Sequence, residues 1–391
     1  MQNESPSTEK MEEDTPQMVA TLVAPPQQNV QGLPEDMAFV QKGLSFLLFI
    51  GLIGLSIWAI SGFSGGGITY GPSAMSIELH DEFDSLIQSD NVTLTGKGVT
   101  VCIVDTGINL NHIELEGINL IGWKDFVASI PDPYDDNGHG TMMAGILVAK
   151  QYFIGLAPDV DLLVAKALPA DGTGSDATVA EAIDWCTNSN ADVISLSLGG
   201  APSGVPAFFG GSDSEEAVGN ALQQGIVVVA AAGNDGESGD DNDVASPGIV
   251  ENAICVGAVD TQGNIWEGSS VGDNNGRLLP PMLPRFDPDQ KPELVAPGEQ
   301  VPVILPDGQW GLASGTSAST VYVSGAIALM FEAHPEWKPD GAQGGSESSV
   351  ETIKEWIQSS VKPKESQNGH DDYYGYGLLQ VEALITTAGQ N

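Results

Sequence analysis

Short runs of consecutive apolar residues recur from about residue 90 to the end of the sequence, with helix-like stretches between them. The runs are continuous rather than alternating, which is typical of parallel strands covered on both faces. We expect strands near residues 99–104, 162–168, 193–198, 226–231 and 254–259. We expect helices near residues 139–150, 177–188, 214–224, 317–333 and 349–360. This order predicts an α/β fold of three layers, in which helices cover both faces of a mostly parallel, doubly wound sheet.

The first part of the chain differs from the rest. Residues 1–42 are acidic, rich in Pro and Gln, and lack an apolar period, which predicts a disordered tail. Residues 43–63 carry no charge and would span about 30 Å as a helix, enough to cross a bilayer. We therefore expect a single transmembrane helix there, then a spacer over residues 64–90 and one folded domain over residues 91–391.

Two other interpretations of residues 43–63 stay open: a buried core helix, or the apolar part of a cleaved signal peptide. Lys42 directly precedes the run, and the next basic residue downstream is Lys97. The positive-inside rule then places the tail in the cytoplasm. We expect a single-pass protein of the cell membrane whose N-terminus is cytoplasmic and whose folded domain is extracellular.

The chain carries 53 acidic and 13 basic side chains, a formal net charge of −40. Nucleic-acid binding requires clusters of Lys and Arg, which the sequence lacks, so we expect no nucleic-acid partner. Three cysteines do not form a disulfide framework. We expect Cys102, Cys186 and Cys255 to be buried free thiols.

Two motifs place an ionisable side chain at the end of an expected element. In VCIVDTG, an apolar strand runs directly into Asp105. In DDNGHGTMMAG, His139 opens a helix that Asp136 or Asn137 can cap. Each residue also has an ordinary structural interpretation, as a turn acid or a structural histidine. Asp-Thr-Gly also marks aspartic proteases, but those need two such carboxylates, and the sequence has no second Asp-Thr-Gly.

Two further motifs carry a hydroxyl and an amide. SGTSAST leads into an apolar helix and puts Ser317 at its N-terminus, where free N–H groups and the helix dipole favour developing negative charge. Ser314 or Thr316 can serve as the cap of that helix. IVVVAAAGND is an apolar strand followed by Asn234. An Asn side chain can donate a hydrogen bond to an oxyanion, but an Asn in a turn is otherwise unremarkable.

The order Asp, His, Asn, Ser in these motifs resembles that of the subtilisin-like serine proteases, the subtilases of peptidase family S8. The resemblance extends from about Lys97 to Ala383. It includes, in family order, the segments GKGVTVCIVDTGINLNHIEL, NGHGTMMAG, GLAPDVDLLVAKALPADGTG, ADVISLSLGG, VVVAAAGNDG, ICVGAVD, KPELVAPG, GTSAS and YGYGLLQVEAL.

The resemblance implies a serine endopeptidase that hydrolyses peptide bonds of proteins through an acyl-enzyme intermediate. Ser317 would attack the scissile carbonyl, and His139 would take its proton and pass it to the leaving amine. Asp105 would fix the tautomer of His139 and stabilise its cation. The Asn234 side chain and the Ser317 backbone N–H would bind the oxyanion.

The resemblance also implies a set of substrate-binding residues. Two chain segments would clamp an extended peptide as an added strand, and further residues would form the P1 pocket, with Ala245 at its floor. With an acidic rim over residues 240–243, we expect basic or medium apolar P1 residues to be preferred over acidic ones. The implied residues are Thr173, Gly174, Ser197, Leu198, Gly199, Ala231 and Ala245.

The sequence departs from the family pattern at two places. Met142-Met143 stands where the family usually has His-Val, and Ala318-Ser319-Thr320-Val321-Tyr322 where it usually has Met-Ala-x-Pro-His. The segment GTSAS also resembles the corresponding segment of the sedolisins, but those proteases use a Glu base rather than a histidine. Neither departure removes a catalytic group.

No cofactor is expected to be required. Residues 149–155 are short where many relatives carry a longer calcium-binding loop, so we expect no tight calcium site there. The acidic stretches 132–136 and 240–243 could bind calcium weakly, although solvated surface acids are the favoured interpretation.

The expected partners are protein or peptide substrates, and a membrane through residues 43–63. Only about 25 residues separate the membrane run from the protease-like region, and the inhibitory prodomain usual in the family does not fit in that space. Either folding needs no such helper, or a separate inhibitor or folding helper supplies it. Two rival functions stay open. An inactive binding module on the same fold would lack a triad or oxyanion residue, and an adhesion or scaffold protein would carry binding repeats. The sequence shows neither signature.

Overall fold

The computed structural model describes residues 71–199, 212–236, 243–276 and 283–390. The tail predicted over residues 1–42 and the transmembrane helix predicted over residues 43–63 lie outside these ranges. Within the described ranges, no helix has both the length and the apolar character needed to cross a membrane.

Seven strands form one parallel sheet, in the order β2-β3-β1-β4-β5-β6-β7. The strands β2 and β3 extend the sheet on one side of β1, and β4 to β7 extend it on the other, so the winding reverses between β1 and β4. In open α/β sheets, ligands bind at such a switch point, beyond the carboxyl ends of the strands. The bounds are β1 Thr100–Asp105, β2 Leu120–Asp125, β3 Asp161–Lys166, β4 Val193–Leu196, β5 Val227–Ala231, β6 Ile254–Val259 and β7 Leu294–Pro297.

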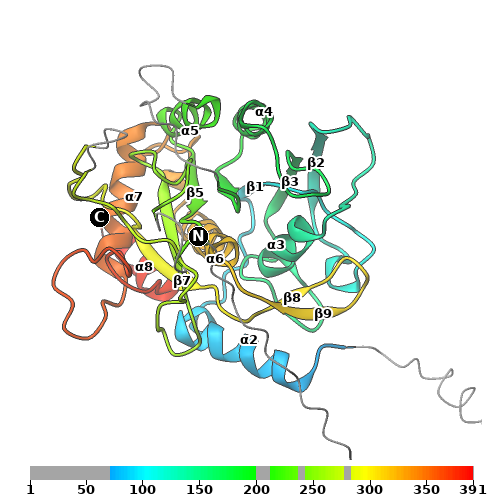
Figure 1. The fold of residues 1–391 in the computed structure, drawn as a ribbon, viewed down its shortest axis with the longest axis horizontal. Coiled ribbons are helices and arrows are strands. Elements are labelled where there is room, and N and C mark those ends of the chain that lie inside the picture. The colour runs from blue at the N-terminus through cyan, green and yellow to red at the C-terminus, as the bar shows by residue number, and fades with distance from the viewer. Residues whose placement is uncertain (1–70, 200–211, 237–242, 277–282, 391) are drawn as a thin grey trace, which may run out of the picture. The chain divides into compact units, whose positions relative to one another are not determined.

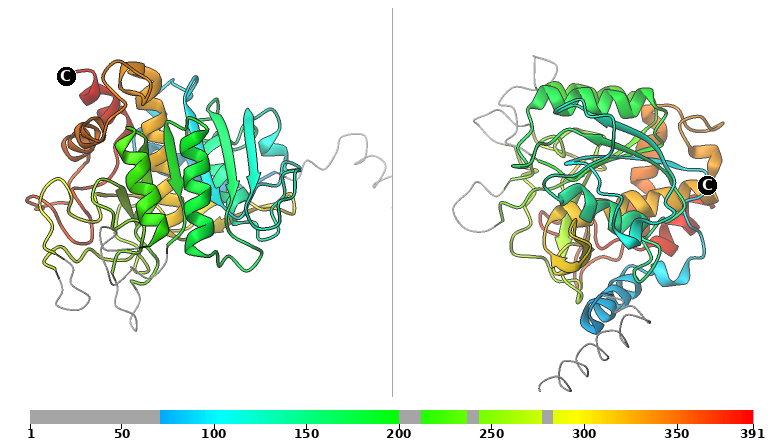
Figure 2. Two further views of the ribbon diagram at one scale, coloured as in Figure 1. Left: turned by 90° about the horizontal axis from the view of Figure 1, so that it is seen from above. Right: turned by 90° about the vertical axis from the view of Figure 1, so that its right-hand side faces the viewer.

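Helices cover both faces of the sheet (Figures 1 and 2). The helices α4 and α5 lie together on one face, and α3 and α6 pack on the other. The predicted α/β class, with a mostly parallel sheet between helical layers, is therefore confirmed. The bounds are α2 Ala74–Leu86, α3 His139–Val148, α4 Asp176–Asn188, α5 Asp213–Gln223, α6 Thr316–Ala333, α7 Glu347–Ser360 and α8 Val381–Ala388.

The central strand β1 shows why the buried strands of this sheet are continuous apolar runs. Val101 and Ile103 belong to the core under α3 and α6, whereas Cys102 and Val104 belong to the core under α4 and α5. Successive side chains of a strand point to opposite faces, so a strand covered on both faces must be apolar throughout.

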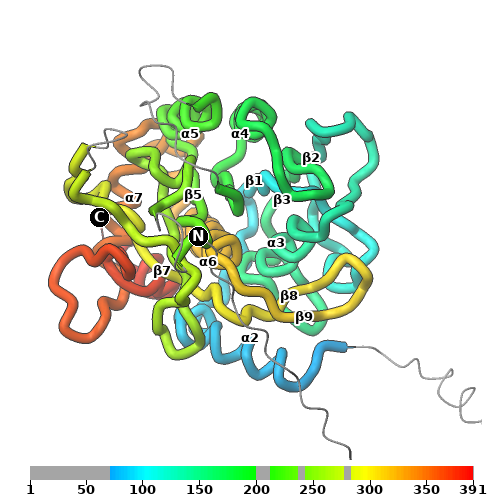
Figure 3. The backbone as a smooth tube through the Cα atoms, viewed as in Figure 1, coloured from blue at the N-terminus to red at the C-terminus, as the bar shows by residue number. Residues whose placement is uncertain are grey.

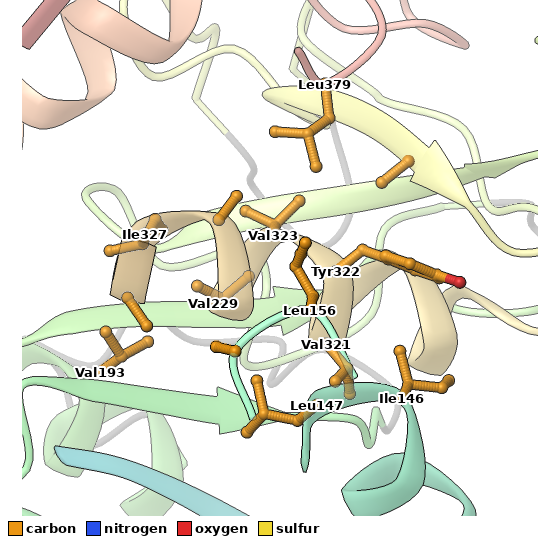
Figure 4. Close-up of a cluster of buried hydrophobic side chains, with 14 of the residues drawn as sticks. Ile146, Leu147, Leu156, Val193, Val229, Val321, Tyr322, Val323, Ile327 and Leu379 are labelled. Atoms are coloured by element: carbon orange, nitrogen blue, oxygen red, sulfur yellow. The ribbon is translucent and has the colours of Figure 1, made fainter. Parts of the chain in front are cut away.

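The helix α6 runs through the larger core. Figure 4 shows its side chains Val321, Val323 and Ile327 surrounded by apolar residues of α3 and of the strands β4 and β5. All but a few of its residues are buried, which fixes the helix rigidly beneath the sheet. Ser317 is the second residue of α6, so its backbone position is fixed as well.

The helix α2 lies beside an antiparallel hairpin formed by β8 Val301–Ile304 and β9 Trp310–Ala313 (Figure 3). Phe83 of α2 and Ile87 just after it are fully buried. The domain therefore begins earlier than we expected, because this helix falls within the spacer predicted over residues 64–90. Its apolar residues are few, so the sequence pattern did not stand out.

A disulfide joins Cys102 of β1 to Cys186 of α4, with their Cα atoms 5.8 Å apart. Our prediction of three free thiols was wrong for these two residues. They are 84 positions apart, and only the packing of α4 on β1 brings them together. Cys255 is free, and burial raises the pKa of its thiol to about 12.

Replacing both Cys102 and Cys186 by alanine should lower the free energy of unfolding by roughly 2–5 kcal/mol, because the cross-link restricts the unfolded chain. The measurement is denaturant unfolding of the peptidase domain, with Cys255→Ala as the matched control. Thiol titration of the unfolded wild type should find one free thiol per chain. Three free thiols, or equal stability of the double variant, would contradict the cross-link.

Candidate active site

Three neighbouring strands deliver the candidate residues to one edge of the sheet. Asp105 is the last residue of β1, Ser197 follows β4 directly, and Asn234 follows β5. The order β1-β4-β5 makes these ends adjacent. The N-termini of α3 and α6 bring His139 and Ser317 to the same edge.

Asp105 and His139 are in direct contact. The Nδ1 atom of His139 lies 2.7 Å from Oδ1 and 2.9 Å from Oδ2 of Asp105, whose side chain is fully buried. A carboxylate can only accept, so Nδ1 carries the hydrogen and Nε2 keeps a free lone pair. The histidine is therefore held in the tautomer that can accept a proton at Nε2.

The surroundings of His139 act in opposite directions on its pKa. Burial alone lowers the pKa, but the negative charge and hydrogen bond of Asp105, together with the charge of Asp135, outweigh it. The net effect raises the pKa of His139 above its ordinary value of 6.5. A more basic imidazole is better able to take the proton of an attacking hydroxyl.

Asp135 joins the chain segment that carries Asp105 to the start of the helix that carries His139. Its Oδ1 accepts hydrogen bonds from the Thr106 hydroxyl at 2.9 Å and from Gly138 N at 2.7 Å, and its Oδ2 accepts from Thr141 N at 2.9 Å. Thr106 follows Asp105 in the chain, and Thr141 lies in the first turn of α3. Burial alone raises the pKa of Asp135, but these hydrogen bonds outweigh it and lower the pKa.

The expected capping of α3 was therefore only partly right. The helix begins at His139, and Asn137 Oδ1 accepts from His139 N at 3.1 Å. Asp136 does not cap the helix and instead pairs with Lys166. Asp135 is the acid that bonds to the start of α3, and the sequence pattern alone does not distinguish among three consecutive polar residues.

Ser317 forms a reciprocal contact with Ser197. The Ser317 hydroxyl donates to Ser197 O at 3.1 Å, and the Ser197 hydroxyl donates to Ser317 O at 3.0 Å. No hydrogen bond joins Ser317 to His139 in this conformation. Catalytic hydrogen bonds are often loose in a free enzyme and tighten when substrate binds.

Asn234 is oriented by its neighbour in α6. Its Oδ1 accepts from the Thr316 backbone N at 3.0 Å and from the Thr316 hydroxyl at 3.0 Å. This assignment leaves Nδ2, which has two hydrogens to donate, without a partner among the described residues. Asn234 is exposed and next to Ser317, so Nδ2 is available to an oxyanion formed there.

A cleft of about 670 Å³ opens beside these residues and is lined by both His139 and Ser197. The predicted clamp residues Thr173, Gly174, Leu198 and Gly199 line it as well. The two residues predicted for the P1 pocket do not, since Ala231 and Ala245 are 3% and 5% exposed. Most of the predicted acidic rim over residues 240–243 lies outside the described residues.

Lys166 is a site residue that sequence reasoning missed. It is fully buried at the end of β3, and its Nζ donates to Thr106 O at 2.5 Å, Leu168 O at 2.9 Å and Asp136 Oδ1 at 2.6 Å. It thereby ties the Asp105 strand end to the His139 loop and to the edge of the cleft. A lysine inside the apolar run LLVAKAL was the available signal, because lysines are almost never fully buried unless paired.

The short loop over residues 149–155 does not fit a calcium ion. Fully buried Glu114 accepts hydrogen bonds from the backbone N–H groups of Gln151, Tyr152 and Phe153, and from Trp310 Nε1. Both carboxylate oxygens are thus occupied by donors, whereas calcium needs free oxygen ligands. Among the residues that the structure describes, no group of three or more His, Cys, Asp or Glu is arranged to hold a metal ion.

The fold and this constellation define a subtilase. Residues 96–377 match the family model described as the Subtilase family, peptidase S8, and the chain belongs to that family. Subtilisin DY of Bacillus licheniformis is 35% identical over 304 residues, covering 76% of this chain and 96% of that protein. Subtilisin NAT of Bacillus subtilis subsp. natto is 34% identical over 293 residues, covering 74% of this chain and 66% of the relative.

A solved structure agrees with this assignment. The crystal structure of a cold adapted subtilisin-like serine proteinase aligns with a TM-score of 0.57 at 27% identity, covering 74% of this chain and 91% of that chain. The predicted family is thus confirmed from both sequence and fold.

The acid limb of kcat/KM should have its midpoint above pH 6.5. Protonated His139 cannot accept the Ser317 proton, so activity is present above the raised pKa and is lost as pH falls through it. Asp135→Asn should move this midpoint to lower pH, because it removes a negative charge that raises the pKa. The measurement is the pH profile of kcat/KM on a neutral peptide.

Asp132→Asn is the matched control for that profile, because it removes an exposed charge from the same segment. An unchanged midpoint in Asp135→Asn, or an equal shift in both variants, would contradict the assigned role of Asp135.

Proposed function

We propose that this chain is a serine endopeptidase that cleaves proteins or peptides through an acyl-enzyme intermediate, with its catalytic domain held outside a membrane. The observation that carries the catalytic part is the contact between buried Asp105 and half-buried His139, together with Ser317 at the N-terminus of α6, which bonds to Ser197 on the cleft that His139 also lines. Membership of the subtilase family, a family of serine-type endopeptidases, supports the same reaction.

The reaction begins when the Ser317 side chain rotates from Ser197 O toward His139. A serine hydroxyl changes partner by a single staggered rotation about χ1, which exposed and half-buried residues make readily. His139 Nε2 then takes the hydroxyl proton as Ser317 Oγ attacks the carbonyl carbon, and Asp105 stabilises the resulting imidazolium.

Charge on the substrate oxygen is met by two donors. The Asn234 Nδ2 amide and the Ser317 backbone N–H, at the free N-terminus of α6, can both donate to it. His139 next gives its proton to the leaving amine, which leaves an acyl ester on Ser317. A water activated by His139 hydrolyses that ester and restores the free enzyme.

Two features support a location outside the cytosol. The Cys102–Cys186 disulfide is of the kind that persists in oxidising compartments. The uncharged run over residues 43–63 has the length of a membrane helix, and Lys42 on its N-terminal side favours a cytoplasmic tail. We therefore propose a single-pass membrane protein whose peptidase domain faces the extracellular side.

The proposed partners are protein substrates, and a separate inhibitor or folding helper stays a prediction. The proposed chemistry requires no cofactor, because His139 transfers the protons, Asp105 stabilises the imidazolium, and Asn234 and the Ser317 N–H stabilise the oxyanion.

A membrane-impermeant fluorophosphonate probe, added to intact cells that express the full chain, tests the proposal. The wild type should be labelled, because an activated Ser317 attacks the phosphorus, and the label should sediment with membranes. Ser317→Ala should show no label, and the matched control Ser314→Ala should be labelled. Deletion of residues 43–63 should leave the protein in the soluble fraction inside the cell, where the probe reaches it only after the cells are broken.

The outcomes separate the two parts of the proposal. An unlabelled wild type that is folded would indicate an inactive binding module. Labelling only after the cells are broken would contradict the extracellular location but not the nucleophile.

A further inference from the structure

One segment of the chain lies directly behind the turn that carries Asn234. Its Ala245 N donates to Ala232 O at 2.7 Å, two residues before Asn234. Its Gly248 packs so closely that a Cβ there would lie 3.0 Å from Ala231 O, at the end of β5. A shift of this segment would therefore move the amide that donates to the oxyanion.

The same segment continues into a turn over residues 249–253, just before β6, and three basic side chains donate to carbonyl groups of this turn. The three bonds are Arg285 Nη2 to Ile249 O at 2.6 Å, Lys354 Nζ to Glu251 O at 3.0 Å, and Lys291 Nζ to Ala253 O at 2.6 Å. The whole chain has only 13 lysines and arginines, so three on one turn is a large share. The position of this turn therefore depends on these cations.

Two of the three cations are buried and share one carboxylate. Lys291 and Lys354 are almost fully buried. The Oε1 atom of Glu293, which is buried as well, lies 2.7 Å from Lys291 Nζ and 3.1 Å from Lys354 Nζ. The Oε2 atom of Glu293 accepts from Cys255 N of β6 at 2.7 Å. Asp289 also pairs with Lys354. Buried charges are costly unless they are paired, so the members of this cluster depend on one another.

The charge of Lys291 decides how many of these bonds it can form. An ammonium group has three hydrogens, and three acceptors lie near Nζ: Ala253 O, Glu293 Oε1 and, at 3.5 Å, Glu251 O. A neutral amine has only two hydrogens to donate and cannot balance the charge of Glu293. Loss of the proton should therefore loosen the turn over residues 249–253.

The surroundings of Lys291 weaken its hold on this proton. Burial is the main cause that lowers its pKa from 10.5 to about 8. The charge of Glu293 opposes this effect, whereas the positive charges of Lys354 and Arg285 add to it. Cys255 opposes it to a smaller extent. Lys291 therefore loses its proton at mildly alkaline pH.

We propose that Lys291 is a positioning residue for the peptidase reaction. Its ammonium group, with Lys354 and Arg285, holds the turn over residues 249–253 and so keeps Asn234 where the oxyanion forms. The inference rests on the proposed peptidase function and adds a residue that acts on it through Asn234. The reaction is slower when Lys291 is neutral, because the amide is then no longer held in the best position to donate.

A role in stability alone gives a different dependence on pH. The pKa of Lys291 is lowered from its ordinary value of 10.5 to about 8 in the fold, so the folded chain loses this proton first. Between these pH values the unfolded chain binds more protons, and Lys291 by itself makes the fold more stable as the pH rises. A loss of activity over this range without a loss of melting temperature therefore indicates positioning rather than unfolding.

The pH profile of kcat, measured on the full chain in detergent with a neutral peptide, tests the proposal. We expect kcat of the wild type to fall reversibly with a midpoint near pH 8. The fall should be roughly tenfold, less than the ~10²–10³ that loss of an oxyanion donor costs. KM should change little, because Asn234 acts on the transition state. The melting temperature should not fall over the same range.

Lys291→Met keeps the length of the side chain but cannot titrate, so kcat should be low throughout and the step near pH 8 should disappear. Lys362→Met is the matched control, because it removes an exposed lysine just after α7, and it should keep the wild-type profile. Arg285→Gln is a second test that does not depend on Lys291→Met folding normally. It removes a positive charge that lowers the pKa of Lys291, so it should move the midpoint to higher pH.

A wild type whose kcat stays level through the alkaline range would overturn the proposal. So would the same step in Lys291→Met, a change that lies in KM alone, or a step that coincides with a fall of the melting temperature. If no peptide is cleaved and Ser317 does not react with the fluorophosphonate, the peptidase function itself fails, and this inference fails with it. If Ser317 reacts and peptides are cleaved without such a step, only the role of Lys291 is wrong.

Discussion

The contact between the buried carboxylate of Asp105 and Nδ1 of His139 is the interaction on which the rest of the site depends. It fixes the tautomer of the imidazole, leaves Nε2 free, and raises the histidine pKa against the opposing effect of burial. A fully buried carboxylate is costly unless it is hydrogen-bonded. Here His139 Nδ1 and the Thr106 N–H satisfy it, so the same contact that serves chemistry also makes the burial of Asp105 tolerable.

A network of hydrogen bonds at the carboxyl edge of the sheet holds this contact in place. Asp135 joins Thr106 to the first turn of α3, and Lys166 joins Thr106 to Asp136 and Leu168. Gly140 permits this closeness, because any Cβ there would collide with the carbonyl oxygen of Gly107. This network joins the Asp105–His139 pair to Leu168, which lines the cleft, so the pair and this part of the cleft keep fixed relative positions. A preorganised site requires such fixed positions.

The helix α6 positions the other two groups of the site, Ser317 and Asn234. Its burial on almost all sides fixes Ser317 and Thr316, and through Thr316 it orients the amide of Asn234. The far end of the cleft is built differently, from the N-termini of α4 and α5, which are stabilised by acidic residues.

The sequence predicted a feature correctly where the residue pattern is compatible with few structures. The continuous runs around Val101 and Val229 predicted the buried parallel strands. The motif order singled out Asp105, His139, Asn234 and Ser317, which the structure brings to one edge of the sheet. The sequence was insufficient where contacts are set by tertiary packing, as for the Cys102–Cys186 disulfide and for α2. β2 was missed because it is half-exposed, and β7 because its short apolar run contains a proline, which is uncommon inside a sheet. The role of Asp135 depends on which of several neighbouring acids points inward, and a single sequence does not contain that information.

The central claim is that Ser317, His139 and Asn234 act on one carbonyl group. A crystal structure of the peptidase domain with a peptide boronic acid tests it most directly, because boron forms a tetrahedral adduct with an activated serine. The account predicts a bond from boron to Ser317 Oγ, one boronate oxygen within hydrogen-bond distance of Asn234 Nδ2, and His139 Nε2 close to the other. A boronate bound elsewhere, or an Asn234 amide turned away from the adduct, would contradict it.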